Sequence, residues 1–286
     1  MSDFFNKIQS LQEPYLIAEI GINHNGDLNI AKKLIDASNA CGWQCVKFQK
    51  RNPDVCVPDH QKNIIRETPW GKMKYIDYKI KIEFQKKQYD DINLYCSAKP
   101  IDWTVSVWDL DSLKFLNNYK IPFIKIPSAC ITNLELITET AKTKIPLIVS
   151  TGMSDWKIID NAVNTLSKHT NDFALLHCNS TYPAPYNELN LNVIPTMIKR
   201  YNCIVGYSGH EYDLEPSVIA ASLGAKIIER HVTLDHEMWG TDQKSSLEVH
   251  AMDLLRKRLK NLNAMLGNNE KKITESEKPI MKKLRI

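Results

Sequence analysis

The segment that decides the fold is Gly206-Tyr207-Ser208-Gly209-His210, read with the later segment Glu229-Arg230-His231-Val232-Thr233. Each follows a short apolar run, and these runs, 203–205 and 225–228, are predicted to be strands. Because side chains alternate between the faces of a strand, Ser208 and His210 share one face, as do Glu229 and His231. Two histidines at the ends of neighbouring strands can share a divalent metal ion. Either histidine alone is more simply a packing or capping residue, so the metal interpretation depends on the other strands.

The pattern of a short apolar run followed by a helical segment recurs along the whole chain. The expected strands are residues 15–21, 45–49, 103–108, 123–126, 146–150, 173–178, 203–205 and 225–228. This alternation predicts parallel strands with helical crossovers, and eight such units in about 250 residues predict a single-domain α/β protein, a (β/α)8 TIM barrel. A doubly wound open sheet is the alternative, but residues 21–26 lack the G-x-G-x-x-G phosphate loop that it favours after its first strand.

The expected organisation has three parts: an N-terminal lead-in at 1–14, the barrel at 15–268 and a C-terminal tail at 269–286. One helix is expected from about residue 73 to 94, and a final helix from about 248 to 266. Residues 51–71 contain three prolines and are expected to be an irregular loop, a feature that is usually functional in a compact domain.

Composition narrows the class of protein. The charged fraction is 24%, and no apolar run approaches the ~20 residues needed to cross a membrane, so no membrane partner is expected. The polar N-terminus has no signal-peptide pattern, and seven scattered cysteines indicate a cytoplasmic protein without disulfides. The net charge of +4 is small and dispersed, which argues against nucleic-acid binding and permits an anionic small substrate.

Polar residues collect where the predicted strands end, which is where barrel enzymes place their active sites. They are Glu19, Asn23, Lys47, Gln49, Ser106, Lys125, Ser128, Ser150, Ser180, Tyr182, Ser208, His210, Glu229 and His231. A lysine in an apolar strand is costly to bury unless it meets an anion. The set therefore suits a ligand with a phosphate and a carboxylate, together with a metal ion for a carbonyl oxygen. Lys125 and Ser128 share a face only if their strand stops at Pro127.

Seven motifs in the correct order resemble the sialic acid (N-acetylneuraminate) synthase family, and in particular a short branch without the C-terminal antifreeze-like domain. They are residues 17–26 (IAEIGINHNG), 46–49 (VKFQ), 148–153 (IVSTGM), 175–178 (LLHC), 206–210 (GYSGH), 229–235 (ERHVTLD) and 240–248 (GTDQKSSLE). The resemblance extends from about residue 15 to 266.

The resemblance implies a transferase of sialic acid biosynthesis that condenses phosphoenolpyruvate with an N-acylated hexosamine, most simply N-acetylmannosamine. The products would be a nine-carbon 2-keto sugar acid and phosphate. By the resemblance, a manganese or magnesium ion binds to His210 and His231. Phosphoenolpyruvate binds to Lys47, Ser106, Lys125, Ser128, Ser150, Ser180 and Ser208. The catalytic residues near the sugar and the reacting carbons are Glu19, Gln49, Tyr182 and Asp242. Cys130, Cys178, Cys203, His24 and His177 are interpreted as structural.

Three departures from the family pattern leave the acceptor open. Ser106 stands where many members carry threonine, Ser180 where many carry asparagine and Cys130 where many carry glutamate. The alternatives are a synthase that uses a 6-phosphorylated or differently substituted sugar, and an inactive barrel that acts as a binding subunit. The resemblance also implies a homodimer. The mouth of the barrel is expected to be covered by the loop at 51–71 or by a separate antifreeze-like protein.

Overall fold

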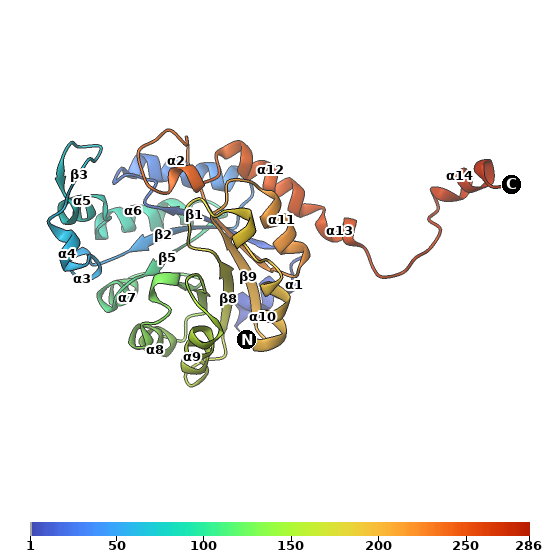
Figure 1. The fold of residues 1–286 in the computed structure, drawn as a ribbon. Helices are drawn as coiled ribbons and strands as arrows, with labels where there is room; N and C mark the ends of the chain where they lie inside the picture. The colour runs from blue at the N-terminus through green and yellow to red at the C-terminus, as the bar shows by residue number, and fades with distance from the viewer. Residues whose placement is uncertain (1) are drawn as a thin grey trace.

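The computed structural model describes residues 2–286, and within them eight parallel strands form a closed barrel (Figure 1). They are β1 (Tyr15–Gly21), β2 (Cys45–Lys50), β5 (Asp102–Val107), β6 (Ile124–Ile126), β7 (Leu147–Ser150), β8 (Phe173–Cys178), β9 (Ile204–Gly209) and β10 (Ile227–His231). The first strand pairs with both β2 and β10, which closes the sheet. The predicted (β/α)8 barrel is confirmed, and the open doubly wound sheet is wrong.

Helices on the outside of the barrel connect successive strands, and one more follows the last strand. The main ones are α2 (Leu28–Ala40), α6 (Lys86–Ser97), α7 (Leu110–Leu116), α8 (Leu134–Lys142), α9 (Trp156–Ser167), α10 (Val193–Tyr201), α11 (Glu215–Ser222) and α12 (Val249–Lys260). Four of these helices are preceded by an N-cap residue whose side chain accepts a hydrogen bond from a backbone N–H group of the first turn: Asp27, Asp109, Asn133 and Asp155. Such caps satisfy backbone donors that have no partner inside the helix. Along residues 2–286, every helix is too short or too polar to cross a lipid bilayer.

The core has two parts, one on each side of the sheet. The larger lies between the strands and the surrounding helices and includes Trp43, Val46 and Leu136. The smaller lies inside the barrel at the end where the strands begin. Here Phe5 and Ile8 of α1 (Asp3–Ser10) pack among strand residues and are fully buried. The N-terminal segment thus closes this end of the barrel, so a ligand must enter from the opposite end.

The segment between β2 and β5 differs from its prediction. Residues 51–71 are not irregular, because they contain α3 (Pro53–Cys56), α4 (Asp59–Lys62) and the first strand of a hairpin formed by β3 (Ile65–Arg66) and β4 (Met73–Lys74). The single helix expected at 73–94 is wrong, since α5 (Tyr75–Ile82) ends before α6 begins. The break occurs at Glu83, whose backbone is extended and whose carboxylate accepts hydrogen bonds from Lys50 Nζ and Arg51 N.

The end of the chain also differs from its prediction. The expected final helix at 248–266 is interrupted at Asn261, so that α13 (Leu262–Leu266) follows α12, and α14 (Glu277–Leu284) lies away from the barrel in Figure 1. Residues 2–286 also contain three short 3-10 helices: η1 (Ser128–Cys130), η2 (Tyr186–Glu188) and η3 (Gln243–Ser245). Because β6 stops at Ile126 and η1 begins at Ser128, the strand does end before Pro127, as the shared use of Lys125 and Ser128 requires.

Candidate active site

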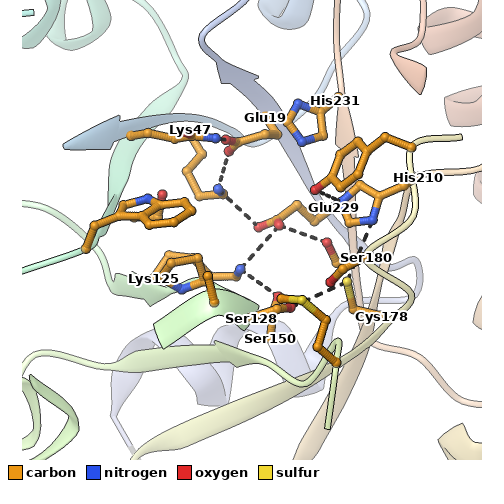
Figure 2. Close-up of a pocket in the computed structure, with 18 residues that line it drawn as sticks. Glu19, Lys47, Lys125, Ser128, Ser150, Cys178, Ser180, His210, Glu229 and His231 are labelled. Carbon is orange, nitrogen blue, oxygen red and sulfur yellow. Dashed lines mark hydrogen bonds and ion pairs between the residues drawn. The ribbon is translucent and has the colours of Figure 1, made fainter. Parts of the chain in front are cut away.

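A cavity of about 200 Å³ opens at the end of the barrel where the strands finish (Figure 2). It is lined by Glu19, Lys47, Gln49, Ser106, Trp108, Lys125, Pro127, Ser128, Ala129, Ser150, Met153, Cys178, Ser180, Tyr182, Ser208, His210, Glu229 and His231. Every residue that the sequence predicted for the site is in this lining except Asn23 and Asp242. Asn23 is buried, and its Nδ2 donates to the Val232 carbonyl and to Ser246 Oγ. Asp242 sits at the rim beside η3, with its Oδ2 3.9 Å from Nδ1 of His231.

Two buried lysines share one carboxylate at the centre of the cavity. The carboxylate of Glu229, on β10, lies 3.4 Å from Lys125 Nζ and 3.8 Å from Lys47 Nζ, and it accepts a 3.0 Å hydrogen bond from Ser208 Oγ. Figure 2 shows Glu229 between the two amines. Burial disfavours its charge, but Lys125, Lys47 and Ser208 outweigh burial and lower the pKa of Glu229 to about 2. The carboxylate therefore holds both ammonium groups in place.

Glu19 differs from Glu229 although both carboxylates contact Lys47. Glu19 forms a salt bridge with Lys47 and accepts a 2.9 Å hydrogen bond from Gln49 Nε2. Burial raises the pKa of Glu19, and the nearby charge of Glu229 adds to this effect, against the opposing influence of Lys47. A buried carboxylate with a raised pKa is suited to accept a proton during a reaction.

The opposite wall of the cavity presents hydroxyl groups beside a close backbone approach. Lys125 Nζ donates to Ser150 Oγ at 2.7 Å, and the Gly152 N–H donates to Ser128 Oγ at 3.0 Å. A Cβ atom on Gly152 would lie 2.8 Å from Ser128 Oγ and closer still to Ser180 Oγ, so any larger residue would displace these hydroxyls. An amine, three hydroxyls and a backbone N–H together form a suitable cradle for an anion.

The two predicted metal ligands lie side by side, with ring centroids 5.6 Å apart. Nδ1 of His210 donates to the Asn179 carbonyl at 2.6 Å, and its Nε2 lies 2.8 Å from the Tyr182 hydroxyl. Nδ1 of His231 is buried and has no hydrogen-bond partner in the part of the chain that the structure describes. Burial lowers the pKa of His231 to about 3, despite the opposing charge of Asp242, so its ring is in the neutral form that binds metals.

These two histidines fit a metal ion only as an open site. Within residues 2–286, no group of three or more His, Cys, Asp or Glu side chains is arranged to hold a metal ion. The unpartnered Nδ1 of His231 and the adjacent His210 ring supply two nitrogen donors, and the remaining positions would be left for water and substrate oxygens.

Five lining residues were not among the residues predicted for the site: Trp108, Pro127, Ala129, Met153 and Cys178. Trp108 and Cys178 carry no signal in the sequence, since an apolar residue at the end of a strand is usually core. Glu229 was predicted at this end of the barrel, because it precedes His231 by two positions and so shares its face, but it was given no role. Cys178, interpreted as structural from the sequence, in fact lines the cavity, with its Sγ 3.6 Å from Ser128 Oγ and 3.7 Å from Nδ1 of His210.

Comparison with known proteins agrees with this arrangement. The sequence profile of the NeuB family matches residues 34–271. The chain belongs to the NeuB family. This membership confirms the resemblance drawn from the motifs, and it makes the chain an enzyme of the class that synthesises sugar acids from phosphoenolpyruvate.

Relatives named for different products have similar identity to this chain. The chain is 35% identical to N,N'-diacetyllegionaminic acid synthase of Campylobacter jejuni over 93% of its own length and 81% of that protein. It is 38% identical to N-acetylneuraminate-9-phosphate synthase of Drosophila melanogaster, over 84% of its length and 66% of that protein. The crystal structure of the N-acetylneuraminic acid synthetase of Leptospira borgpetersenii with citrate superposes with a TM-score of 0.84 at 28% identity, covering 95% of this chain and 91% of that one.

Proposed function

We propose that this chain condenses phosphoenolpyruvate with an N-acylated hexosamine, N-acetylmannosamine or a derivative of it, to give a nine-carbon 2-keto sugar acid and phosphate. A carbon–carbon bond forms between C3 of phosphoenolpyruvate and the sugar aldehyde. Water adds at C2, and the bond between C2 and the phosphate oxygen breaks. The observation that carries the proposal is the pair of buried lysines, Lys47 and Lys125, in a cavity whose other wall is made of hydroxyls.

Phosphoenolpyruvate suits this cavity because its two anionic groups are close together on a small molecule. Lys125, Ser150 and the groups around Gly152 offer donors to one of them, and Lys47 offers a cation to the other. These ammonium groups are paired with the carboxylates of Glu229 and Glu19, so binding exchanges one set of charge contacts for another. The same amines can stabilise the charge that develops on the departing phosphate.

The other half of the cavity would activate the sugar and the water. A manganese or magnesium ion, when bound by His210 and His231, would polarise the aldehyde oxygen as a Lewis acid. Glu19 is in a position to take the proton of the water that adds at C2, and Gln49 fixes the direction of its carboxylate through the 2.9 Å hydrogen bond. Tyr182 and Asp242, at the rim, would orient the acceptor.

The test is phosphate release from phosphoenolpyruvate in the presence of manganese and a panel of amino sugars. Lys47→Met should raise the apparent KM for phosphoenolpyruvate, or lower kcat, while leaving the KM for the sugar nearly unchanged. Lys142→Met, which removes a surface lysine paired with Glu139, serves as the matched control. Absence of phosphate release with every amino sugar would contradict the proposed function, and a selective loss of sugar affinity in Lys47→Met would contradict the role of Lys47.

The proposal extends to the surroundings of the enzyme. Tyr182 and Met153 at the mouth are 42% and 67% exposed, and covering them would exclude water from the reacting carbons. We assign this cover to residues 51–71. The alternative is a separate antifreeze-like protein or the second subunit of a homodimer, and sedimentation of the purified chain would reveal a dimer.

All seven cysteines are free thiols, which supports a cytoplasmic location.

A further inference from the structure

A second cavity, of about 240 Å³, lies next to the first one, which we call the reaction cavity. Its lining includes Arg51, Tyr75, Lys79, Glu83 and Trp108, and we call it the side cavity. Trp108 lines both cavities, so the two adjoin at this residue. The residues come from the end of β2, from α5 and from the end of β5, so the side cavity is built by the segment that departs most from the regular strand–helix alternation.

Gln49 connects the two cavities. Its Nε2 donates a hydrogen bond to Glu19 Oε1 inside the reaction cavity, and its Oε1 accepts a hydrogen bond from Arg51 Nη2. The guanidinium group of Arg51 is stacked on Trp108, with its Cζ 3.9 Å from the ring centroid. A ligand that extends outward from the reaction cavity past Gln49 would therefore meet the guanidinium group of Arg51.

The cations of the side cavity have unused bonding capacity. Nε of Arg51 is buried and has no hydrogen-bond partner among residues 2–286. Nζ of Lys79 lies 5.2 Å from the centroid of the Tyr75 ring and 5.3 Å from that of Tyr78, and no carboxylate of the described chain forms a salt bridge with it. Burial and the like charge of Arg51 lower the pKa of Lys79 to about 8.

The one carboxylate in the lining does not neutralise these cations. Glu83 accepts hydrogen bonds from Lys50 Nζ at 2.8 Å and from the backbone N–H of Arg51 at 3.0 Å, and Lys50 is itself buried. The charge of Glu83 is therefore already balanced by Lys50. Two further cations beside one cavity repel each other, and an anionic ligand would remove that repulsion.

We propose that the side cavity binds a phosphate group at the far end of the acceptor sugar, held by Arg51 and Lys79. This inference rests on the proposed function, because it takes the aldehyde end of the sugar to lie in the reaction cavity. The preferred acceptor is then an N-acylated hexosamine that is phosphorylated on the hydroxyl most distant from the aldehyde, a 6-phosphate. The product keeps that phosphate, and only the phosphate of phosphoenolpyruvate is released.

The experiment compares N-acetylmannosamine with its 6-phosphate as acceptors at saturating phosphoenolpyruvate and manganese. The wild-type chain should have the lower KM for the 6-phosphate. Lys79→Gln should raise that KM by roughly ten- to a hundredfold, the range expected for one charge-assisted hydrogen bond, and should leave the KM for the free sugar unchanged. Lys79→Arg should retain most of the preference.

The matched control is Lys81→Gln. Lys81 lies on the same helix, α5, but it is exposed, sits over Trp70 and does not line the side cavity. The Lys81→Gln substitution removes the same charge from the same helix and should leave both KM values unchanged. An equal loss in Lys81→Gln and Lys79→Gln would overturn the inference, since it would show a general electrostatic effect.

Two further outcomes separate this inference from the proposed function. Equal KM values for the two sugars in the wild-type chain would overturn the phosphate site and leave the synthase activity standing. Failure to release phosphate with either sugar would refute the proposed function. Calorimetric binding of N-acetylmannosamine 6-phosphate alone then decides the inference: binding that Lys79→Gln weakens supports it, and binding that is absent or unchanged by Lys79→Gln overturns it.

Discussion

Replacing Glu229 by glutamine removes the one charge that holds both buried lysines in the reaction cavity. At an effective dielectric constant of about 20, the carboxylate attracts Lys125 at 3.4 Å by roughly 5 kcal/mol and Lys47 at 3.8 Å by roughly 4 kcal/mol. The cost of burying the carboxylate offsets much of this attraction. Removing one partner from a buried ion pair typically costs about 3–5 kcal/mol, and we expect about 3 kcal/mol here because Lys47 keeps its contact with Glu19.

Urea unfolding at pH 7, in a buffer free of phosphate and sulfate, measures this loss. Glu237→Gln, which changes an exposed carboxylate in the segment after β10, is the control and should unfold like the wild-type chain. Inorganic phosphate should stabilise the Glu229→Gln variant more than the wild-type chain, because the anion takes the place of the missing carboxylate. A free energy of unfolding within about 0.5 kcal/mol of wild type, the usual range for neutral surface changes, would refute the reasoning.

The pH dependence of the same difference provides a second check. The pKa of Glu229 is about 2 in the folded chain, below its ordinary value of 4.5. A lowered carboxyl pKa contributes stability that is fully present above the unfolded pKa and is lost as the pH falls toward the folded one. The gap between the wild-type chain and Glu229→Gln should therefore be widest above pH 4.5 and shrink as the pH falls toward 2.

Three other predictions concern separate parts of the molecule. Excess chelator should abolish turnover and manganese should restore it, and His231→Ala should lose the rise in Tm that manganese gives the wild-type chain; full turnover in chelator would contradict the metal site. Gly152→Ala should raise the KM for phosphoenolpyruvate at least about tenfold, because the added methyl group displaces Ser180 Oγ and one charged contact is lost. Combining Gly152→Ala with Ser180→Gly should recover part of the loss. A KM unchanged by the single substitution would argue against the close packing. Burial lowers the pKa of His24 to about 3. Between pH 6.5 and pH 3 the unfolded chain therefore binds a proton that the folded chain does not. The free energy of unfolding should fall there by about 1.4 kcal/mol for each unit of decreasing pH. His24→Phe, which can keep the stacking on Phe84, should flatten that slope in urea titrations at several pH values, and parallel curves for the two proteins would contradict it.

The barrel and most of the reaction cavity could be predicted because they depend on local periodicity. Alternation along a strand is enough to put Ser208 with His210 and Lys47 with Gln49 on the faces that the structure gives them. Helix starts were equally predictable, since Asp109 and Asp155 cap through backbone groups only three residues away. These features need no knowledge of which segments meet in space.

The rest depends on contacts between distant residues. The helical pattern runs through Glu83 without a visible break, and what ends α5 is the contact between that carboxylate and Lys50, 33 residues earlier. The sequence predicted that Lys47 and Lys125 would meet an anionic ligand. The structure shows that carboxylates of the chain itself, Glu229 and Glu19, balance them. Arg51 and Lys79 were not recognised at all, because only tertiary structure brings the end of β2 beside α5.

The packing of α1 under the barrel has a consequence for how the chain folds as it is made. Phe5 and Ile8 leave the ribosome before every strand of the barrel, yet the cluster that buries them includes Ile227, at the start of the last strand. Their burial must wait for nearly the whole chain, because a contact of such long sequence separation forms only after the intervening loops have closed. During synthesis the first helix is therefore an exposed apolar segment, and it reaches its place only when β10 closes the barrel.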